Sequence, residues 1–243
     1  PTPVSAFFAV GSKAAGLAFL ANLCLSFDFS AVPELLDRAV FALSVIAALT
    51  IIVGNLGGIT QVNVKRLMGF SGISNAGYLL VLITAVLKYR GGADLFDTSL
   101  YFYLTAYMFA SYGIFFVINQ FDGDDDSPLE FSDFRGLIRK SPVADSTLVI
   151  NLASLAGIPP TAGFFGKLLI LIMAWYAQLY VLMAIMIAGS VVSIFYYFGW
   201  IRASIDTAGG DERKLSESVA MQPTMLALSA ATLVFGVFIF YIM

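Results

Sequence analysis

The 243-residue sequence has no histidine and a single cysteine, Cys24. One cysteine cannot form a disulfide within the chain, and the missing histidine removes the commonest proton carrier and metal ligand among the side chains. Charge is also scarce, because only 12% of the residues are Asp, Glu, Lys or Arg. A soluble domain has roughly a quarter of such residues. These shortages exclude an ordinary soluble protein and argue against redox or metal chemistry within the chain.

Hydrophobic residues make up 59% of the sequence, and the mean hydropathy is +0.88. The chain is therefore expected to reside in a lipid bilayer. Its net charge of −3 leaves no basic surface for nucleic acid, which is not expected as a partner. The sequence starts at Pro1 without an initiator methionine or signal peptide, so we expect a piece of a longer protein.

Seven apolar stretches of about the length that crosses a bilayer as a helix follow one another along the chain. They cover residues 3–25, 39–60, 66–87, 98–119, 145–178, 182–202 and 222–242. The pattern predicts an all-α, polytopic membrane helix bundle that forms a single transmembrane domain fragment.

The fifth stretch is too long for one straight span and contains the sequence GIPPTAG. Four of its residues remove backbone donors or loosen a helix, namely Gly157, Pro159, Pro160 and Gly163. We expect two half-helices, 145–157 and 161–178. The first half would be about 20 Å long at 1.5 Å per residue, so the break would lie inside the bilayer. Protein or water must then cover it.

Basic residues are unevenly distributed between alternate loops and ends. Eight lie on one side, namely Lys65, Arg66, Arg135, Arg139, Lys140, Arg202, Arg213 and Lys214, and three on the other, namely Arg38, Lys88 and Arg90. Because cytoplasmic loops retain excess Lys and Arg, the first side is expected to be cytoplasmic. The N-terminal end of the chain would then be cytoplasmic and the C-terminus periplasmic.

Residues 120–144 are expected to form a cytoplasmic loop. In its second half, Phe131, Phe134, Leu137 and Ile138 follow one another at near-helical spacing among charged residues. This spacing is typical of an interfacial helix. The alternative is a loop that merely packs on the ends of the helices.

Two lysines, Lys13 and Lys167, lie deep within predicted spans, and no acidic residue does. An ammonium at such depth costs at least ~2.5 kcal/mol and must face the bundle interior, water or a counter-charge. Removal from water without a fixed partner favours the neutral amine, so such a lysine can gain and lose a proton. This predicts a proton relay. The alternative is a structural role, in which each lysine binds exposed carbonyls and fastens helices together.

Other polar residues within the spans are weaker signals. Asn75 and Tyr107 are candidates for a hydrated path, although hydrogen bonding between helices is the common role of such residues. No Gly-rich phosphate loop or Cys/His metal cluster can be assembled, so neither a cofactor site nor a metal site is expected.

Four ordered segments resemble one family: TPVSAFFAVGSKAAG, GNLGGITQVNVKRLMGFSGISNAGYLL, DFRGLIRKSPVA and LASLAGIPPTAGFFGKLLIL. They are similar to subunit N of bacterial respiratory complex I, the proton-translocating NADH:quinone oxidoreductase, also known as subunit 2. The resemblance spans the whole chain and implies the C-terminal half of a fourteen-helix antiporter-like fold. Lys13 would match the family's lysine in span eight, and Lys167 the lysine in span twelve. The chain departs from the family at Gly72 and Asn75, where Ser and His are common.

The resemblance implies a translocase subunit of the bacterial inner membrane, driven by quinone reduction elsewhere in the complex. Its partners would be other membrane subunits of complex I and the lipid bilayer. The chain itself would hold no cofactor, since NADH, FMN, iron–sulfur clusters and quinone would belong to other subunits. Two alternatives remain open at this point: a subunit of a multi-subunit sodium/proton antiporter, and a membrane scaffold that conducts nothing.

Overall fold

A computed structural model describes residues 2–27, 33–89, 93–121, 128–207 and 219–242 of the chain. The α-helices in this part of the chain are α1 (Thr2–Ser26), α2 (Pro33–Ile59), α3 (Val64–Tyr89), α4 (Ala93–Asn119), α5 (Leu137–Lys140), α6 (Pro142–Ala156), α7 (Ala162–Tyr176), α8 (Tyr180–Ile205) and α9 (Gln222–Ile242). Two 3₁₀ turns, η2 (Phe131–Phe134) and η3 (Val219–Met221), accompany them. None of the described residues forms a strand, so the expected all-α fold is confirmed.

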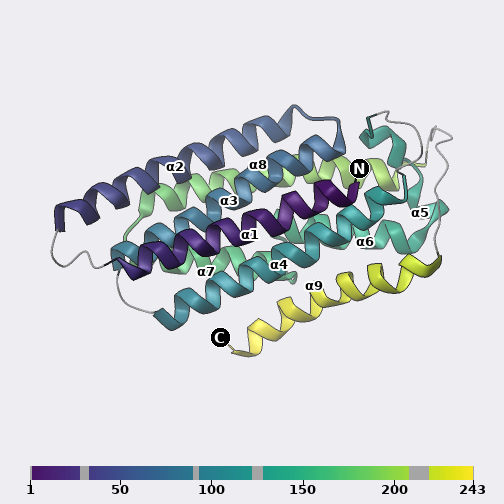
Figure 1. Ribbon diagram of the computed structural model, residues 1–243. Helices are drawn as coiled ribbons and strands as arrows, with labels where there is room; N and C mark the ends of the chain where they lie inside the picture. Colours follow the sequence, from purple (N-terminus) through teal and green to yellow (C-terminus); the bar gives the residue numbers. More distant parts are fainter. Residues whose placement is uncertain (1, 28–32, 90–92, 122–127, 208–218, 243) are drawn as a thin grey trace.

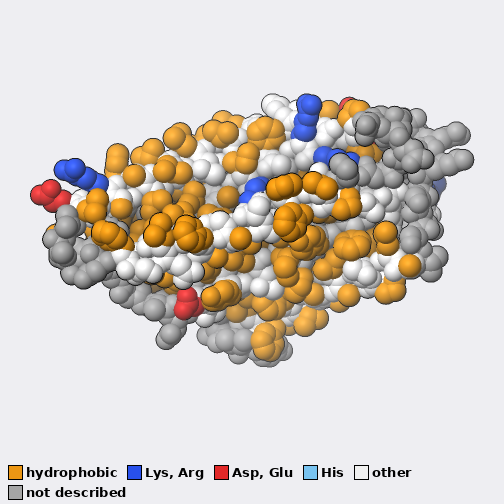
Figure 2. Space-filling view, viewed as in Figure 1, with side chains coloured by type: hydrophobic (Ala, Val, Ile, Leu, Met, Phe, Trp, Pro, Cys, Tyr) orange, Lys and Arg blue, Asp and Glu red, His pale blue; other side chains and the backbone are white. Residues whose placement is uncertain are grey.

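The long helices lie side by side in an elongated bundle (Figure 1). Six of them are long and apolar enough to cross a membrane, namely α1, α2, α3, α4, α8 and α9. Apolar side chains cover much of the visible face, on which charged side chains are few (Figure 2). The protein is therefore a multi-pass membrane protein, in which helices satisfy their own backbone hydrogen bonds in lipid.

Burial differs sharply between the helices. In the most apolar stretch of α3, 83% of the residues are buried, compared with 17% in α1 and 22% in α2. α3 is thus surrounded by other helices, whereas α1 and α2 present wide apolar faces outward. The polar side chains of Ser71, Ser74, Asn75 and Thr84 on α3 therefore lie in the interior of the bundle.

The fifth apolar stretch is broken, as the sequence indicates. α6 ends at Ala156, and Gly157 follows in the left-handed conformation with φ 84°. The amides of Gly157 and Ile158 both donate to the Ala153 carbonyl at 3.0 Å, which completes the helix end. α7 begins at Ala162.

α9 covers the break. A Cβ on Gly236 would overlap the Pro160 carbonyl oxygen and approach the Ala162 amide nitrogen to 2.7 Å. Glycine at this position therefore lets the backbone of α9 lie directly on the interrupted segment. On the side that faces α9, the peptide groups from Pro160 to Ala162 are thus covered by protein.

The segment expected to form one interfacial helix differs from that expectation. It forms two separate turns, η2 and α5, because Gly136 between them has a left-handed φ of 71°. Phe134 and Leu137 are buried against the ends of the long helices. Phe131 stacks on Trp200 of α8 with ring centres 5.9 Å apart. Phe131, Phe134 and Leu137 therefore pack this segment onto the ends of the helices, as the alternative of a packed loop predicts.

Candidate functional site

Lys167 lies on α7, just after the break, with only 6% of its surface exposed. Its Nζ donates to the carbonyl oxygens of Leu155 at 2.8 Å and Ala156 at 3.1 Å. These are the last carbonyls of α6, where the helix dipole is negative. Nζ also lies 5.1 Å from the centre of the Tyr78 ring, a distance at which the ring face attracts a cation. Backbone and ring dipoles thus take the place of a counter-ion.

Two glycines shape the surroundings of Lys167. A Cβ on Gly157 would lie 3.1 Å from Lys167 Cδ, and the positive φ of Gly157 also disfavours other residues. On the far side, a Cβ on Gly166 would lie 2.8 Å from the Tyr103 ring. The helix break and the tyrosine of α4 therefore close tightly around the lysine.

Lys13 of α1 is half-buried, and its ammonium lies directly against Gly72 of α3. A Cβ on Gly72 would overlap Nζ and would lie 3.2 Å from the Tyr107 hydroxyl oxygen. That hydroxyl donates to the Ala9 carbonyl of α1 at 3.2 Å. The absence of a side chain at residue 72 makes the space that the ammonium fills.

Each lysine lines a small cavity of about 10 Å³, which is the order of one water molecule. The cavity at Lys167 is also lined by Asn75, Tyr103, Ala106, Tyr107, Ser154, Leu155 and Gly163. The cavity at Lys13 is also lined by Ala14, Leu17, Gly72, Asn75, Ala76, Leu79, Leu104 and Tyr107. Asn75 and Tyr107 belong to both sets, so they separate the two cavities.

Hydrogen bonds fix the orientation of Asn75. Its Oδ1 accepts from the Tyr103 hydroxyl at 2.6 Å, and its Nδ2 donates to the Ser71 carbonyl at 2.8 Å. The Ser71 hydroxyl in turn makes a short hydrogen bond with the Tyr197 hydroxyl. The amide is held between α3 and α4 and cannot turn freely, so any water beside it meets a defined set of donors and acceptors.

Carboxylates are absent from this site in the described part of the chain. Arg38 and Glu34 form an ion pair at 3.8 Å on the surface of α2, away from the two lysines. No group of three or more Cys, Asp or Glu residues in the described ranges could hold a metal ion. The arrangement offers two amines, hydroxyls, an amide and room for water, which is chemistry suited to holding and passing protons.

The residues predicted from sequence divide into two groups. Lys13, Lys167, Asn75 and Tyr107 all line one or both cavities, together with Gly163 of the break. Gly157 lies against Lys167. Pro159 and Pro160 are exposed and line neither cavity; they interrupt the helix without contributing to the site.

Among the lining residues that the sequence does not single out as site residues are Gly72, Tyr103 and Ser154. Tyr103 precedes Tyr107 by one helical turn, so the two share a face of α4, and this spacing was a usable signal. Nothing in the sequence indicates that Gly72 faces Lys13, since the two lie on different helices.

Comparisons with known proteins identify relatives of the chain. The family described as NADH:quinone oxidoreductase/Mrp antiporter, TM, matches residues 1–193. NADH-quinone oxidoreductase subunit N 1 of Opitutus terrae is 39% identical over 98% of this chain and 47% of the relative. NADH-quinone oxidoreductase subunit N of Brevibacillus brevis is 36% identical over 98% of this chain and 46% of the relative. The chain spans about half the length of the curated relatives it matches.

Solved structures give the same result. A chain of respiratory complex I from Thermus thermophilus with bound aureothin has a TM-score of 0.80 and 31% identity. That match covers 97% of this chain and 49% of the other. A chain of the Mrp complex from Dietzia sp. has a TM-score of 0.67 and 21% identity over 82% of this chain and 44% of its own length. The second likeness concerns the fold alone.

Proposed function

Because the chain belongs to the NADH:quinone oxidoreductase/Mrp antiporter transmembrane family, we propose that it is the proton-conducting C-terminal half of a subunit N of NADH:quinone oxidoreductase. One observation carries the proposal. Two one-water cavities, one at Lys13 and one at Lys167, share Asn75 and Tyr107 as lining residues. A proton can therefore cross between the amines through water and the Tyr107 hydroxyl, with the Asn75 amide holding the water in place.

The mechanism begins with the Lys13 amine, which accepts a proton and becomes charged. The proton passes through water and the Tyr107 hydroxyl to Lys167, while the Asn75 amide, which does not itself take up a proton, orients the water. Lys167 is poised to hold it, because the Leu155 and Ala156 carbonyls stabilise an ammonium without binding it as tightly as a carboxylate would. A further cation approaching Lys167 repels the ammonium and drives the proton onward.

The driving force lies outside this chain. Quinone reduction in other subunits changes the charge next to the relay, and NADH, FMN, iron–sulfur clusters and quinone belong to those subunits. The partners are the other membrane subunits of the oxidoreductase and the surrounding lipid of the bacterial inner membrane. The end of the bundle that bears η2 and α5, with Arg135, Arg139 and Lys140, faces the cytoplasm.

Substitution of the lysines in the full-length protein, assembled in its complex, tests the proposal. Protons pumped per NADH oxidised would be measured in proteoliposomes for Lys167→Met and Lys13→Met. We expect a several-fold loss of pumping with the complex still assembled on native gels. Lys88→Met is the matched control, because Lys88 is exposed at the end of α3. Unchanged pumping in both intramembrane variants would leave a scaffold as the role of this chain.

A sodium/proton antiporter subunit is the second candidate, because the matching family includes Mrp antiporters and the fold is shared with an Mrp complex. The curated relatives named subunit N favour the first candidate. Sodium separates the two. Proton movement that requires a sodium gradient and ignores NADH would favour the antiporter.

A further inference from the structure

The Lys167 ammonium has one N–H more than it has oxygen acceptors in the described part of the chain. An ammonium carries three N–H donors, and the acceptors are the Leu155 and Ala156 carbonyls. The Tyr78 ring of α3 also lies against the lysine, with its centre 5.1 Å from Nζ. The negative face of an aromatic ring attracts a cation at this distance. The ring therefore offers the remaining donor an electrostatic partner.

This arrangement distinguishes the two forms of Lys167. In the ammonium form the third position on nitrogen is an N–H, which the ring face attracts. In the neutral amine both N–H groups are used by the two carbonyls, so the third position is the lone pair, which the negative ring face repels. The carbonyls accept from either form, whereas the Tyr78 ring favours the charged one.

Packing of α2 and α8 holds the Tyr78 ring in place. The side chain is 1% exposed, and its hydroxyl lies beside Asn55 of α2 and Ser190 of α8 without a well-aligned hydrogen bond. A Cβ on Gly189 of α8 would lie 3.3 Å from this hydroxyl oxygen and 2.8 Å from Asn55 Nδ2. Asn55 is itself fixed, because its Oδ1 accepts from the Tyr196 hydroxyl at 3.2 Å. The ring thus keeps its position by close contact at its hydroxyl end.

The other titratable groups that line the cavity of Lys167 are Tyr103 and Tyr107 of α4. Both hydroxyls donate to other groups. Lys13 lies in the neighbouring cavity, and no charged residue of the described parts of α6, α8 or α9 lines the cavity of Lys167. Tyr78 is the aromatic residue whose ring face meets Nζ.

We propose that Tyr78 is a positioning residue for proton release, because the face of its ring favours the ammonium form of Lys167 and so sets how readily the proton leaves. The inference rests on the proposed function, since it requires that Lys167 exchanges protons. A contact that favours the charged form keeps the proton bound up to a higher pH. Weakening the ring face should therefore move the alkaline limit of pumping to lower pH.

Stepwise fluorination of the ring tests the proposal in the full-length protein within its complex. Tyr78 would be replaced by phenylalanine and by its mono-, di- and trifluorinated forms, which differ little in size while each fluorine weakens the negative face. We expect Tyr78→Phe to pump normally, because the hydroxyl has no well-aligned hydrogen bond. Across the series, the alkaline limit of protons pumped per NADH oxidised should fall by about one pH unit. A limit that stays constant would overturn the proposal.

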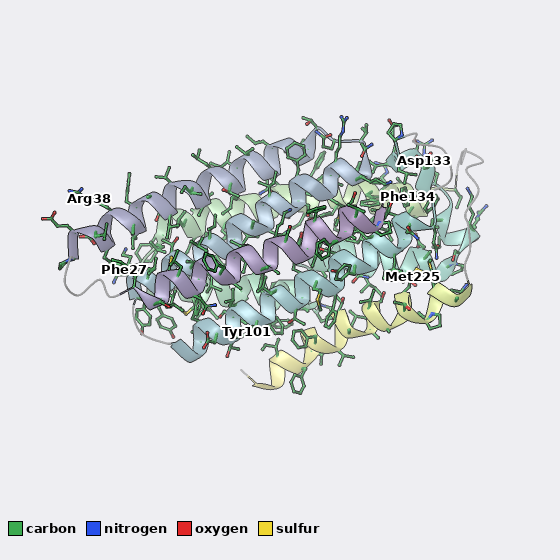
Figure 3. All side chains as sticks on the ribbon, in the orientation of Figure 1. Phe27, Arg38, Tyr101, Asp133, Phe134 and Met225 are labelled. Carbon is green, nitrogen blue, oxygen red and sulfur yellow. The ribbon has the colours of Figure 1, made fainter. Side chains whose placement is uncertain are left out.

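Two control series show whether fluorine acts by itself. Phe96 is 2% exposed, and no cation lies over its ring in the described ranges. Tyr101 is 65% exposed and lies at the outer edge of the bundle (Figure 3). Fluorination at either position should leave the alkaline limit where it is. A shift in the Phe96 series as large as that in the Tyr78 series would contradict a specific role for Tyr78.

Thermal unfolding of the complex measures the pair of Tyr78 and Lys167 without pumping. Melting temperatures at mildly acidic pH would be compared for Tyr78→Phe and its trifluorinated form, each with Lys167 and with Lys167→Met. We expect fluorination to lower the melting temperature only where Lys167 is present, because methionine carries no charge for the ring to attract. An equal effect in both backgrounds would show that the ring only fills space.

These readouts separate this inference from the proposed function. If Lys167→Met pumps normally, the proposed function fails, whatever the fluorinated series shows. If Lys167→Met abolishes pumping but fluorination changes neither the alkaline limit nor the thermal cycle, the relay holds and Tyr78 is a packing residue. Coupling in the thermal cycle without a shift of the alkaline limit would also overturn a role in proton release.

Discussion

Lys13 reaches the interior of the bundle because residue 72 is glycine. The ammonium occupies the volume that a side chain on Gly72 would need, and the Tyr107 hydroxyl lies beside it. Serine is common at this position in the family that the sequence resembles, so this chain has made room where a hydroxyl usually stands. The contact between Lys13 and Gly72 joins α1 to α3. It brings the lysine close to Asn75 and Tyr107, which line both cavities.

Gly72→Ala is therefore expected to displace the ammonium. Because a lysine tip moves readily, the cost in stability should be below about 1 kcal/mol, whereas proton pumping should fall several-fold. Gly69→Ala is the control, since a Cβ there meets nothing within 4 Å on the same helix. Proton pumping by the two variants in assembled complexes checks this, and equal pumping would contradict it.

Tyr103→Phe is expected to release Asn75, because the Tyr103 hydroxyl is the donor to Asn75 Oδ1. The loss leaves a buried carbonyl oxygen without a partner, which costs about 1–3 kcal/mol, and pumping should decrease with it. Tyr101→Phe on the same helix is the comparison, because Tyr101 is 65% exposed. Thermal unfolding of the purified complex and pumping would be measured together. A Tyr103→Phe variant that matches Tyr101→Phe in both would rule out this role.

The two lysines should differ in their effect on stability. Lys167→Met removes the donor to the last carbonyls of α6, so we expect a loss of about 1–3 kcal/mol in addition to lost pumping. Lys13→Met removes no such bond and should be less destabilising. Differential scanning fluorimetry of the complex checks the order. If Lys13→Met lowers the melting temperature more than Lys167→Met, the capping role is wrong.

Gly236→Ala should separate α9 from the helix break. The new methyl group would meet the backbone at Pro160 and Ala162, which cannot yield as a side chain can. We expect a destabilisation of about 1–3 kcal/mol. Gly199→Ala on α8, where a Cβ meets nothing, is the control. Thermal unfolding of the purified complex would report the loss, and equal melting temperatures of the two variants would contradict it.

The sequence was sufficient for the class of fold and the broken helix. The length of each apolar run shows that it can cross the bilayer as a helix. The two prolines between Gly157 and Gly163 predict the break, because proline removes a backbone donor that a helix needs. The sequence was less informative about the segment around Gly136. The spacing of Phe131 and Phe134 relative to Leu137 looked helical, but the left-handed glycine splits the segment and turns its apolar side chains onto the bundle.

The site was only partly predictable for a similar physical reason. Lys13 and Lys167 stand out because charge is costly inside a membrane, and a lysine within an apolar run can be recognised from the sequence alone. Contacts such as those of Gly72 with Lys13, or of Asn151 with Thr232, join residues far apart in the sequence. They depend on how helices are rotated against one another, and apolar runs contain little information about rotation.

The contact between Gly236 and the helix break has a consequence for biogenesis. Ribosomes synthesise α9 after both half-helices, so the interrupted backbone enters the membrane before its cover exists. Until α9 arrives, the peptide groups at Pro160 and Thr161 must be protected by the insertion machinery or by neighbouring subunits. The break is thus covered only once α9 has been synthesised, and a chain that stops short of α9 would leave these peptide groups exposed within the bilayer.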